Sequence, residues 1–87
     1  MAITIEAMGS ATLEKKDNDF SEVTITEAGV LETDLVLIQE TSALPVDLKY
    51  KHSIYVSDVS ADTIKVKSTF KDLPSNITFD YVVFREA

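Results

Sequence analysis

The chain of 87 residues has no cysteine and no tryptophan, and only two glycines and two prolines. Without cysteine it can form no disulfide, no thiolate metal ligand and no cysteine nucleophile. Gly9 and Gly29 stand too far apart to build a glycine-rich phosphate loop. Basic residues are also scarce, with 8 Lys and Arg against 15 Asp and Glu, for a net charge of -7. We therefore expect no nucleic-acid partner, because nucleic acids are bound by basic surfaces that displace counterions.

Long apolar runs are absent as well. No segment approaches the length that crosses a bilayer, and no charged-then-apolar leader opens the sequence, so we expect no membrane partner. What is present favours strands, since Val, Ile, Thr, Phe and Tyr account for 32 of the 87 residues. A single domain of this size removes only about 60% of its unfolded surface from water. Its stability then requires efficient packing of two sheets or association between copies.

Polar and apolar residues alternate along much of the chain, which is the period of strands with one buried face. Residues 63–70 are the clearest case, and strands are predicted in the same way over 3–6, 20–26, 53–59 and 78–85. Residues 35–38 form a further strand that is apolar at every position. The predicted core comprises Ile64, Val66, Phe70, Phe79, Tyr81 and Val83. The expected fold class is all-β, a small β-sandwich or jelly-roll-like barrel of about six to eight strands.

Loops are predicted where the alternation stops. Met8 to Ser10 should end the first strand, and the charged run 14–19 should form an exposed loop. Pro45 places a connection over 41–49, because proline cannot donate to a strand ladder. No segment has a convincing helical period, so no helix longer than about two turns is expected. Residues 1–19 are expected to form an N-terminal strand or arm, and residues 20–87 a β-sandwich domain.

A tight turn is predicted immediately before the strand that begins at Thr63. Ser60 and Asp62 carry side chains that bond nearby backbone N–H groups and hold such turns. Ser60, Asp62 and Thr63 are therefore interpreted as a structural turn and not as a binding site.

Residues that could carry catalysis are few, and we expect no enzyme. His52 is the only histidine, and its neighbour Ser53 should point to the opposite face of the strand. A Ser-His-Asp arrangement with Asp58 is therefore not expected. No pair of acids stands in an apolar setting that would raise a pKa for general acid catalysis.

Two further patterns suggest ligands only weakly. Asp17 and Asp19 flank Asn18 as at the start of a calcium loop, but the glycine and distal glutamate of an EF-hand are missing. A metal site completed by Asp34 or Asp47 remains an alternative, although no cofactor or metal is expected. Tyrosines at 50, 55 and 81 could line a sugar-binding face, but their spread over several strands is more typical of core edges and interfaces.

Two strands carry more apolar residues than one buried face needs. Residues 35–38 are apolar on both faces, and the last strand places Val82 and Phe84 opposite Tyr81 and Val83. A two-layer monomer would leave the second face exposed, which soluble monomers usually avoid. The candidate interface residues are Leu35, Leu37, Val82 and Phe84, to be covered by other copies or by a partner surface.

Charge is unevenly distributed along the chain. Residues 1–48 carry ten acids and two bases, whereas residues 49–87 carry five acids and six bases. This pattern fits a solvated acidic surface. It also fits acidic and near-neutral edges that meet between copies, or an acidic edge that docks on a basic partner.

The segment from Phe20 to Phe84 resembles a small β-domain recurrent among structural proteins of tailed bacteriophages. The resemblance rests on a threonine- and valine-rich strand, a glycine-containing turn, an aspartate that opens an apolar strand, a Leu-Pro element, a small-residue turn with Asp and Thr, and a final alternating strand. In this chain these are 23–26, 27–30, 34–38, 43–45, 59–66 and 78–84. Thr33 stands where a glycine usually precedes the aspartate, and Val46-Asp47 where a glycine usually follows the Leu-Pro element.

The resemblance implies a non-enzymatic virion protein that is assembled in the host cytoplasm. The most direct expectation is a capsid decoration protein that stabilises the shell by binding between subunits of the major capsid protein. It also implies a homo-oligomer, with a trimer as the first expectation. The alternative is a tail-fibre or receptor-binding module that recognises glycans on the host surface.

Overall fold

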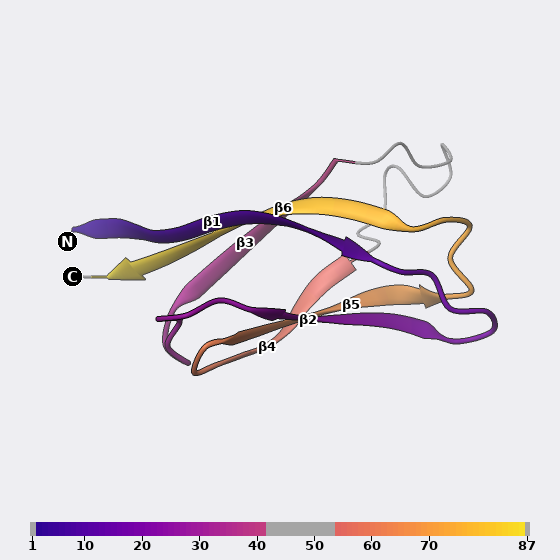
Figure 1. The fold of residues 1–87 in the computed structure, drawn as a ribbon, viewed down its shortest axis with the longest axis horizontal. Coiled ribbons are helices and arrows are strands. Elements are labelled where there is room, and N and C mark those ends of the chain that lie inside the picture. Colours follow the sequence, from indigo (N-terminus) through magenta and orange to yellow (C-terminus); the bar gives the residue numbers. More distant parts are fainter. Residues whose placement is uncertain (1, 42–53, 87) are drawn as a thin grey trace.

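The computed structural model describes residues 2–41 and 54–86. Six strands pair antiparallel in two three-stranded sheets, and this part of the chain contains no helix, which confirms the all-β prediction. The strands are β1 (Ile3–Leu13), β2 (Phe20–Thr26), β3 (Leu35–Glu40), β4 (Ile54–Ser60), β5 (Thr63–Lys71) and β6 (Ile77–Glu86) (Figure 1).

The two sheets lie one above the other as the layers of a small β-sandwich (Figure 1). One has the strand order β1-β6-β3 and the other the order β2-β5-β4. β4 and β5 form a hairpin, whereas the β1–β2, β2–β3 and β5–β6 connections carry the chain from one sheet to the other. β6 and β5 are therefore the central strands, and β1 and β2 are edge strands. Residues 1–19, expected as a strand or an arm, thus contain an edge strand.

Apolar side chains from both sheets meet in one core between the layers. Five of the six predicted core residues are buried: Ile64, Val66, Phe79, Tyr81 and Val83. Phe70 is half-buried and packs against this cluster from the end of β5. The lysines that alternate with them on β5 point outward, so the predicted register of this strand is confirmed.

Loops and strand ends close the core where the sheets diverge. Val30 comes from the β2–β3 loop and Leu73 from the β5–β6 loop, and both side chains are buried. Ser21 and Ser68 are buried as well, and the Ser68 hydroxyl accepts the Ser21 backbone N–H at 2.8 Å. That hydroxyl donates in turn to the Phe70 carbonyl at 2.8 Å, so this buried polar pair satisfies its hydrogen bonds.

β1 continues through Gly9, so the predicted break at Met8 to Ser10 was wrong. Gly9 lies opposite Tyr81 on β6, and the tyrosine ring covers the glycine. A Cβ atom at Gly9 would stand 2.5 Å from the Tyr81 hydroxyl oxygen. Glycine therefore allows the close approach of an aromatic ring within the sheet, and it does not mark a turn.

The first residues of β1 alternate as predicted, but their apolar side chains do not enter the core. Ile3 and Ile5 are exposed, whereas the side chains of Thr4 and Glu6 are hydrogen-bonded to each other and Glu6 to Arg85. A half-buried strand would ordinarily place the isoleucines inward. Here polar contacts occupy the inward side at this end of the sandwich, and the isoleucines join the surface described next.

Candidate interaction surface

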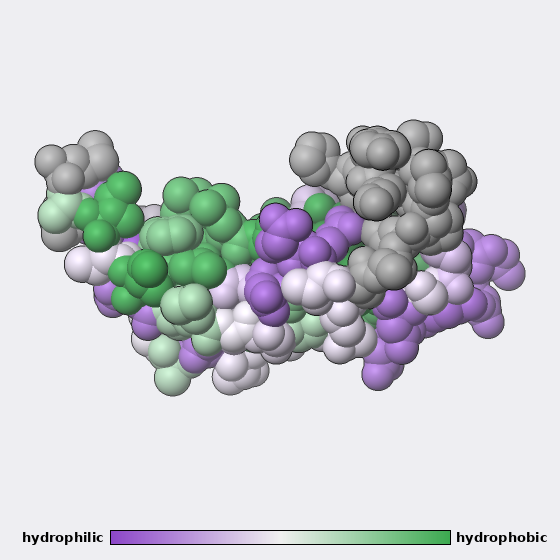
Figure 2. Space-filling model, turned by 90° about the horizontal axis from the view of Figure 1, so that it is seen from above, coloured by the Kyte–Doolittle hydropathy of each residue, from purple (hydrophilic) through white to green (hydrophobic). Residues whose placement is uncertain are grey.

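The outer face of the β1-β6-β3 sheet carries an exposed group of apolar side chains, which we call the apolar patch. In the antiparallel register Leu35 lies opposite Phe84, and Leu37 lies opposite Val82. On the other side of β6, Ile5 lies opposite Phe84, and Met8 lies opposite Val82. The patch comprises Ile3, Ile5, Met8, Leu35, Leu37, Val82 and Phe84. Figure 2 shows it as a continuous hydrophobic area on one half of this face, beside a hydrophilic area.

All four candidate interface residues predicted from the sequence thus lie on one face. Leu35 and Leu37 are 61% and 54% exposed, and Val82 and Phe84 are half-buried between the flanking strands. Residues of one strand that face the same side of a sheet are separated by two positions, which Leu35 and Leu37 follow, as do Val82 and Phe84. The structure brings them together, and their role in an interface remains a prediction.

The three β1 members of the patch were missed from the sequence. Simple alternation would put Ile5 and Met8 on opposite faces of a strand. A β-bulge between Ile5 and Ala7 inserts Glu6 as an extra residue and shifts the phase, so that both side chains point outward. The sequence contains the apolar residues but gives no direct signal for the bulge.

A shallow hollow lies at one end of the apolar patch. It has a volume of about 150 Å³ and is lined by Ile3, Thr33, Leu35, Phe84, Arg85 and Glu86. The hollow gives an otherwise flat surface a place where an apolar side chain of a partner can insert.

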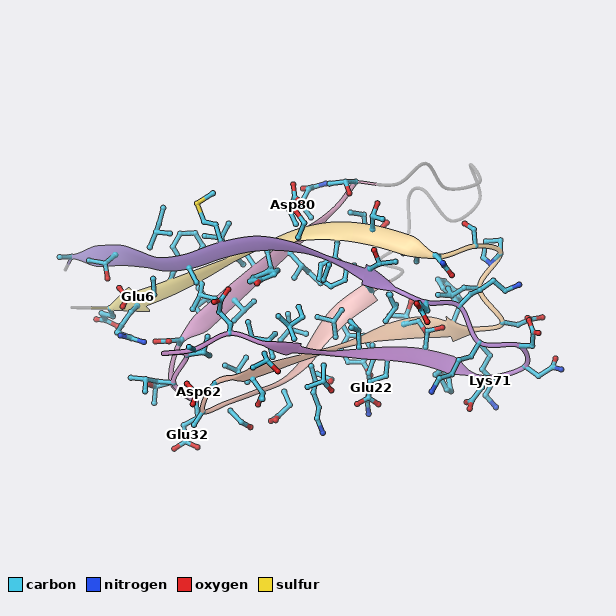
Figure 3. All side chains as sticks on the ribbon, viewed as in Figure 1. Glu6, Glu22, Glu32, Asp62, Lys71 and Asp80 are labelled. Atoms are coloured by element: carbon cyan, nitrogen blue, oxygen red, sulfur yellow. The ribbon has the colours of Figure 1, made fainter. Side chains whose placement is uncertain are left out.

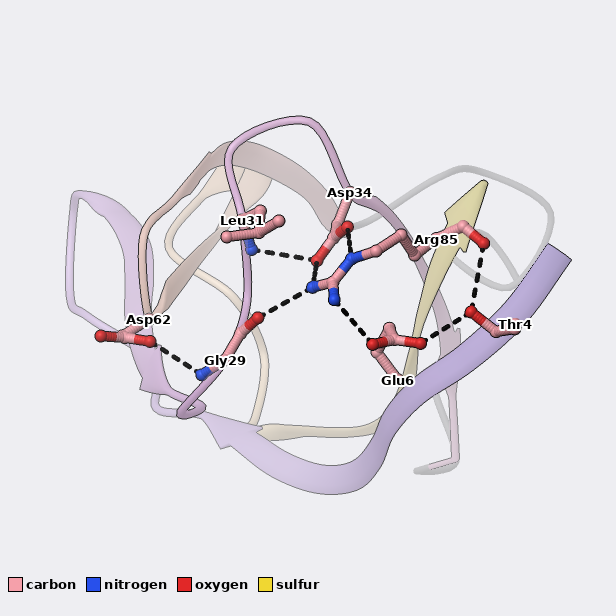
Figure 4. A network of polar contacts seen from close by, with 7 residues as sticks. All are labelled: Thr4, Glu6, Gly29, Leu31, Asp34, Asp62 and Arg85. Carbon is pink, nitrogen blue, oxygen red and sulfur yellow. Dashed lines mark hydrogen bonds and ion pairs between the residues drawn. The ribbon is translucent and has the colours of Figure 1, made fainter. Parts of the chain in front are cut away.

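Arg85 holds this end of the sandwich together on the inward side of the same strands. Its Nε and one terminal nitrogen each donate to Asp34 at 2.8 Å, one to each carboxylate oxygen (Figure 4). The remaining donors reach the Glu6 carboxylate at 2.7 Å and the Gly29 carbonyl at 2.8 Å. One guanidinium therefore joins β6, the β1 bulge and the β2–β3 loop, and we call this group the Arg85 clamp. A planar guanidinium suits such a site because it binds a carboxylate with two parallel hydrogen bonds.

Asp34 is the buried member of the clamp, with its side chain only 1% exposed. The bonds from Arg85, together with the Leu31 backbone N–H at 2.9 Å, hold the pKa of the Asp34 carboxyl at about 2, against an ordinary 3.8. The same pair raises the pKa of Arg85. The ion pair therefore persists at any pH at which the protein would work. The aspartate that opens an apolar strand in the phage resemblance here orders the loop before β3.

The turn at Ala61 and Asp62 lies where the sequence placed it, between Ser60 and Thr63. Its hydrogen bonds differ from the expected local ones. The Asp62 carboxylate accepts the Gly29 N–H at 2.8 Å (Figure 4). The Asp62 N–H donates to the Val30 carbonyl at 2.9 Å. The Ser60 hydroxyl donates to the carboxylate of Asp58. The β4–β5 hairpin is thereby fastened to the β2–β3 loop, which the Arg85 clamp holds from the other side.

Tyr81 supplies a third contact to the β2–β3 loop. Its hydroxyl donates to the Glu27 carboxylate at 2.8 Å from a nearly buried position under the sheet. Burial, reinforced by the bond to Glu27, raises the pKa of Tyr81 to about 12. The loop that carries Glu27, Gly29 and Asp34 is thus bonded to β6 at two positions, Tyr81 and Arg85.

The other ligand patterns do not assemble in the part of the chain that the structure describes. Asp17 pairs with Lys15 at 3.4 Å, and the Asp19 carboxylate accepts its own neighbour's N–H at Phe20. Asp34 is held by Arg85 and cannot complete a calcium site with them. Over residues 2–41 and 54–86 no group of three acidic or histidine side chains could hold a metal ion. Asp47, Tyr50, His52 and Ser53 lie outside the described residues.

The two described tyrosines face different surroundings. Tyr55 is exposed on the outer face of the β2-β5-β4 sheet, opposite Lys67, whereas Tyr81 is buried between the sheets. They do not form a common aromatic surface. A hollow of about 310 Å³ lies beside Tyr55. Several of the polar groups that line it already have partners, because Lys67 pairs with Glu22 at 3.8 Å and the hydroxyls of Ser21 and Ser68 are hydrogen-bonded to backbone groups.

Comparison with models of protein families, with curated proteins and with solved structures finds no match. Among the described residues there is no helical segment that could cross a bilayer.

Proposed function

We propose that this chain is a non-enzymatic structural protein of a bacteriophage virion, a decoration protein that binds between major capsid subunits and stabilises the shell. The observation that carries the proposal is the apolar patch. An exposed group of large apolar side chains beside a polar area is typical of protein-protein contact sites. The Arg85 clamp fastens β1 and β6 near the patch to the β2–β3 loop.

The proposed mechanism is mass action. A protein that binds the assembled shell but not its separated subunits adds its binding free energy to the assembled state alone. Burial of Leu35, Leu37 and Met8 across a joint would supply the apolar part of that energy. Self-association remains part of the proposal, since the chain is short and has no cross-link.

The glycan-binding alternative has less support in the described residues. Sugar recognition would require aromatic faces that converge on one exposed surface. Tyr55 is exposed on one sheet and Tyr81 is buried within the sandwich, so these two described tyrosines do not share a sugar-binding face. The proposal therefore favours the shell over a host receptor.

The test is binding to shells of the phage that encodes the chain. Leu35→Glu with Leu37→Glu places two charges in the apolar patch, and we expect it to abolish shell binding and the added heat resistance of the shell. Thr24→Glu with Thr26→Glu is the matched control, because it adds the same charge to the exposed outer face of the other sheet. The control should bind as the native protein does.

Two results would reject the proposal. One is that the chain is missing from purified virions and does not bind shells. The other is that both double variants bind equally well, which would show that the apolar patch takes no part.

A further inference from the structure

β1 is the longest strand of the described chain, and it has a partner on one side only. It has 11 residues, of which all but the bulged Glu6 pair with β6, and the sheet order β1-β6-β3 leaves its second side at the edge. After the bulge at Glu6, the seven residues from Ala7 to Leu13 follow β6 without interruption. Such an edge presents a regular row of backbone N–H and C=O groups to which another strand can bond.

Edge strands usually carry features that prevent pairing between molecules, and this part of β1 has none. Lysine, proline, added charge and bulges are the common protections. Residues 7–13 contain no charged residue and no proline, and three of them are alanine or glycine. The other edges differ: β2 and β4 are each broken by a bulge, and β3 has only six residues and ends in a glutamate. The open edge of β1 is therefore distinct within the described fold.

This segment is complementary to a second copy of itself. In an antiparallel pair centred on Ser10, the serines lie opposite one another across a twofold axis. The flanking residues then pair as Met8 with Thr12, Gly9 with Ala11, and Ala7 with Leu13. Each pair joins residues of the same face, so outward side chains stay outward and core-facing ones stay inward. No like charges are brought together, and no large side chains collide.

The β1 edge also carries little charge that would oppose the pairing of two copies. Each chain has a net charge of -7, so two copies repel over most of their surface. The only charge on β1 is Glu6, and Arg85 neutralises it at 2.7 Å. Next to Ser10 is Asp80, whose carboxylate accepts the serine hydroxyl at 2.6 Å and points away from the second sheet (Figure 3).

From these observations we propose that two copies of the chain pair antiparallel through residues 7–13 of β1. The pair would have one continuous outer sheet with the order β3-β6-β1-β1-β6-β3. Because the twofold axis is perpendicular to this sheet, both apolar patches lie on the same side, one at each end. A surface with two patches can engage two sites at once, which strengthens binding without a new kind of contact. The pairing concerns the free protein and does not depend on the proposed role in a virion.

Cross-linking tests the register directly, since the chain has no cysteine of its own. Ser10→Cys places two thiols opposite one another at the axis. Opposed residues of antiparallel strands have Cα atoms about 4.5–5.5 Å apart, within the range that a disulfide spans. Mild oxidation should convert most of the protein to a covalent dimer. Gln39→Cys is the control, because Gln39 also flanks Asp80 but on the β3 side, and it should remain largely monomeric under denaturing conditions.

Sedimentation equilibrium tests the association itself. The native protein, of 9.6 kDa per chain, should sediment at twice that mass at micromolar concentration. Ser10→Lys would oppose two lysines at the axis and should raise the dissociation constant of the dimer at least tenfold, about 1.4 kcal/mol. Gln39→Lys adds the same charge beside the same aspartate, and the dimer should persist.

A native protein that stays at the monomer mass, or that sediments as a trimer, would overturn the pairing. So would a Ser10→Lys variant that dimerises like the native protein, or equal cross-linking at positions 10 and 39. If Ser10→Lys does not fold, the cysteine variants decide the matter, because serine and cysteine differ little in size.

Discussion

The outer face of the β2-β5-β4 sheet and the outer face of the β1-β6-β3 sheet are both open to solvent, but they have different side chains. On the first, Glu22 lies opposite Lys67 and Thr24 opposite Lys65 (Figure 3 shows Glu22 pointing away from the sandwich). On the second, leucines of β3 flank valine and phenylalanine of β6. The charge pair of Glu22 with Lys67 favours hydration of the first face, whereas the side chains of the apolar patch on the second face would be buried favourably against a partner.

The comparison changes how doubly apolar strands should be interpreted. A strand that is apolar at every position is usually assigned to the middle of a sheet covered on both faces. Residues 35–38 of β3 follow this pattern, yet β3 is an edge strand with one face in the core and the other exposed. This second apolar face is the feature on which we base the proposed contact with another molecule.

The largest expected difference in stability is between the two faces of β6, tested by the same substitution on each face. Phe79 is buried in the core, and Phe79→Ala should reduce the free energy of unfolding by about 3–5 kcal/mol through lost burial and a cavity. Phe84→Ala, on the outward face of the same strand, should cost distinctly less because the phenyl group is already partly solvated. Urea unfolding measures both, and equal losses would mean that the outer face is packed like a core.

A second pair of variants tests the register of β5. Val66 is fully buried, and Val66→Ala should reduce the free energy of unfolding by about 1–3 kcal/mol. Lys65→Ala on the hydrated outer face should change it by less than about 0.5 kcal/mol. If the lysine variant proved the more harmful, the strand would be shifted by one residue, since such a slip exchanges the faces.

Acid should destabilise the protein at the Arg85 clamp and not at either outer face. The pKa of Asp34 is about 2 in the folded protein and 3.8 ordinarily, so its carboxylate stabilises the fold above the ordinary value. That contribution is lost as the pH falls from 3.8 towards 2. Asp34→Asn should be less stable at neutral pH and should lose this part of the acid sensitivity. Glu32→Gln, which removes an exposed carboxylate from the same loop, should keep the native profile in urea titrations at each pH.

The smallest effect on stability should come with a clear effect on binding. Leu37→Ser creates no cavity, because the leucine already points into solvent. The free energy of unfolding should therefore change by less than about 0.5 kcal/mol. Binding of a dye that fluoresces on apolar surfaces should fall. The same dye should respond little to Thr24→Ser on the other outer face, and an equal response at both positions would contradict the contrast between the faces.

The alternation of polar and apolar residues predicted the fold because it follows directly from the burial of one face of each strand. β2 and β5 each have one face in the core and one hydrated face, so their registers follow from the sequence. β1 could not be predicted in this way, because the alternation gives no signal for the bulge at Glu6, and the contact of Glu6 with Arg85 joins residues 79 positions apart. Gly9 appeared as a turn because the tyrosine that covers it belongs to β6.

The candidate surface was predictable in part, because the pattern of apolar residues within a strand shows which faces are apolar. Leu35, Leu37, Val82 and Phe84 stand out within their own strands as apolar residues beyond the needs of one core face. The clamp was not, because Asp34 and Arg85 are separated by 51 residues and nothing in the sequence around either residue indicates the other as its partner. Paired charges of this kind become visible only once the chain has placed them together.

The position of β6 has a consequence for the order in which the protein folds. The β4–β5 hairpin joins neighbouring segments and can form early, whereas the β1-β6-β3 sheet must wait for its central strand, the last of the six along the chain. Until β6 is in place, β1 and β3 have no neighbour in their sheet, and loops of many residues must close before they gain one. We therefore expect the strands that carry the apolar patch to be ordered last, with their leucines and isoleucines exposed to other unfinished chains during that interval.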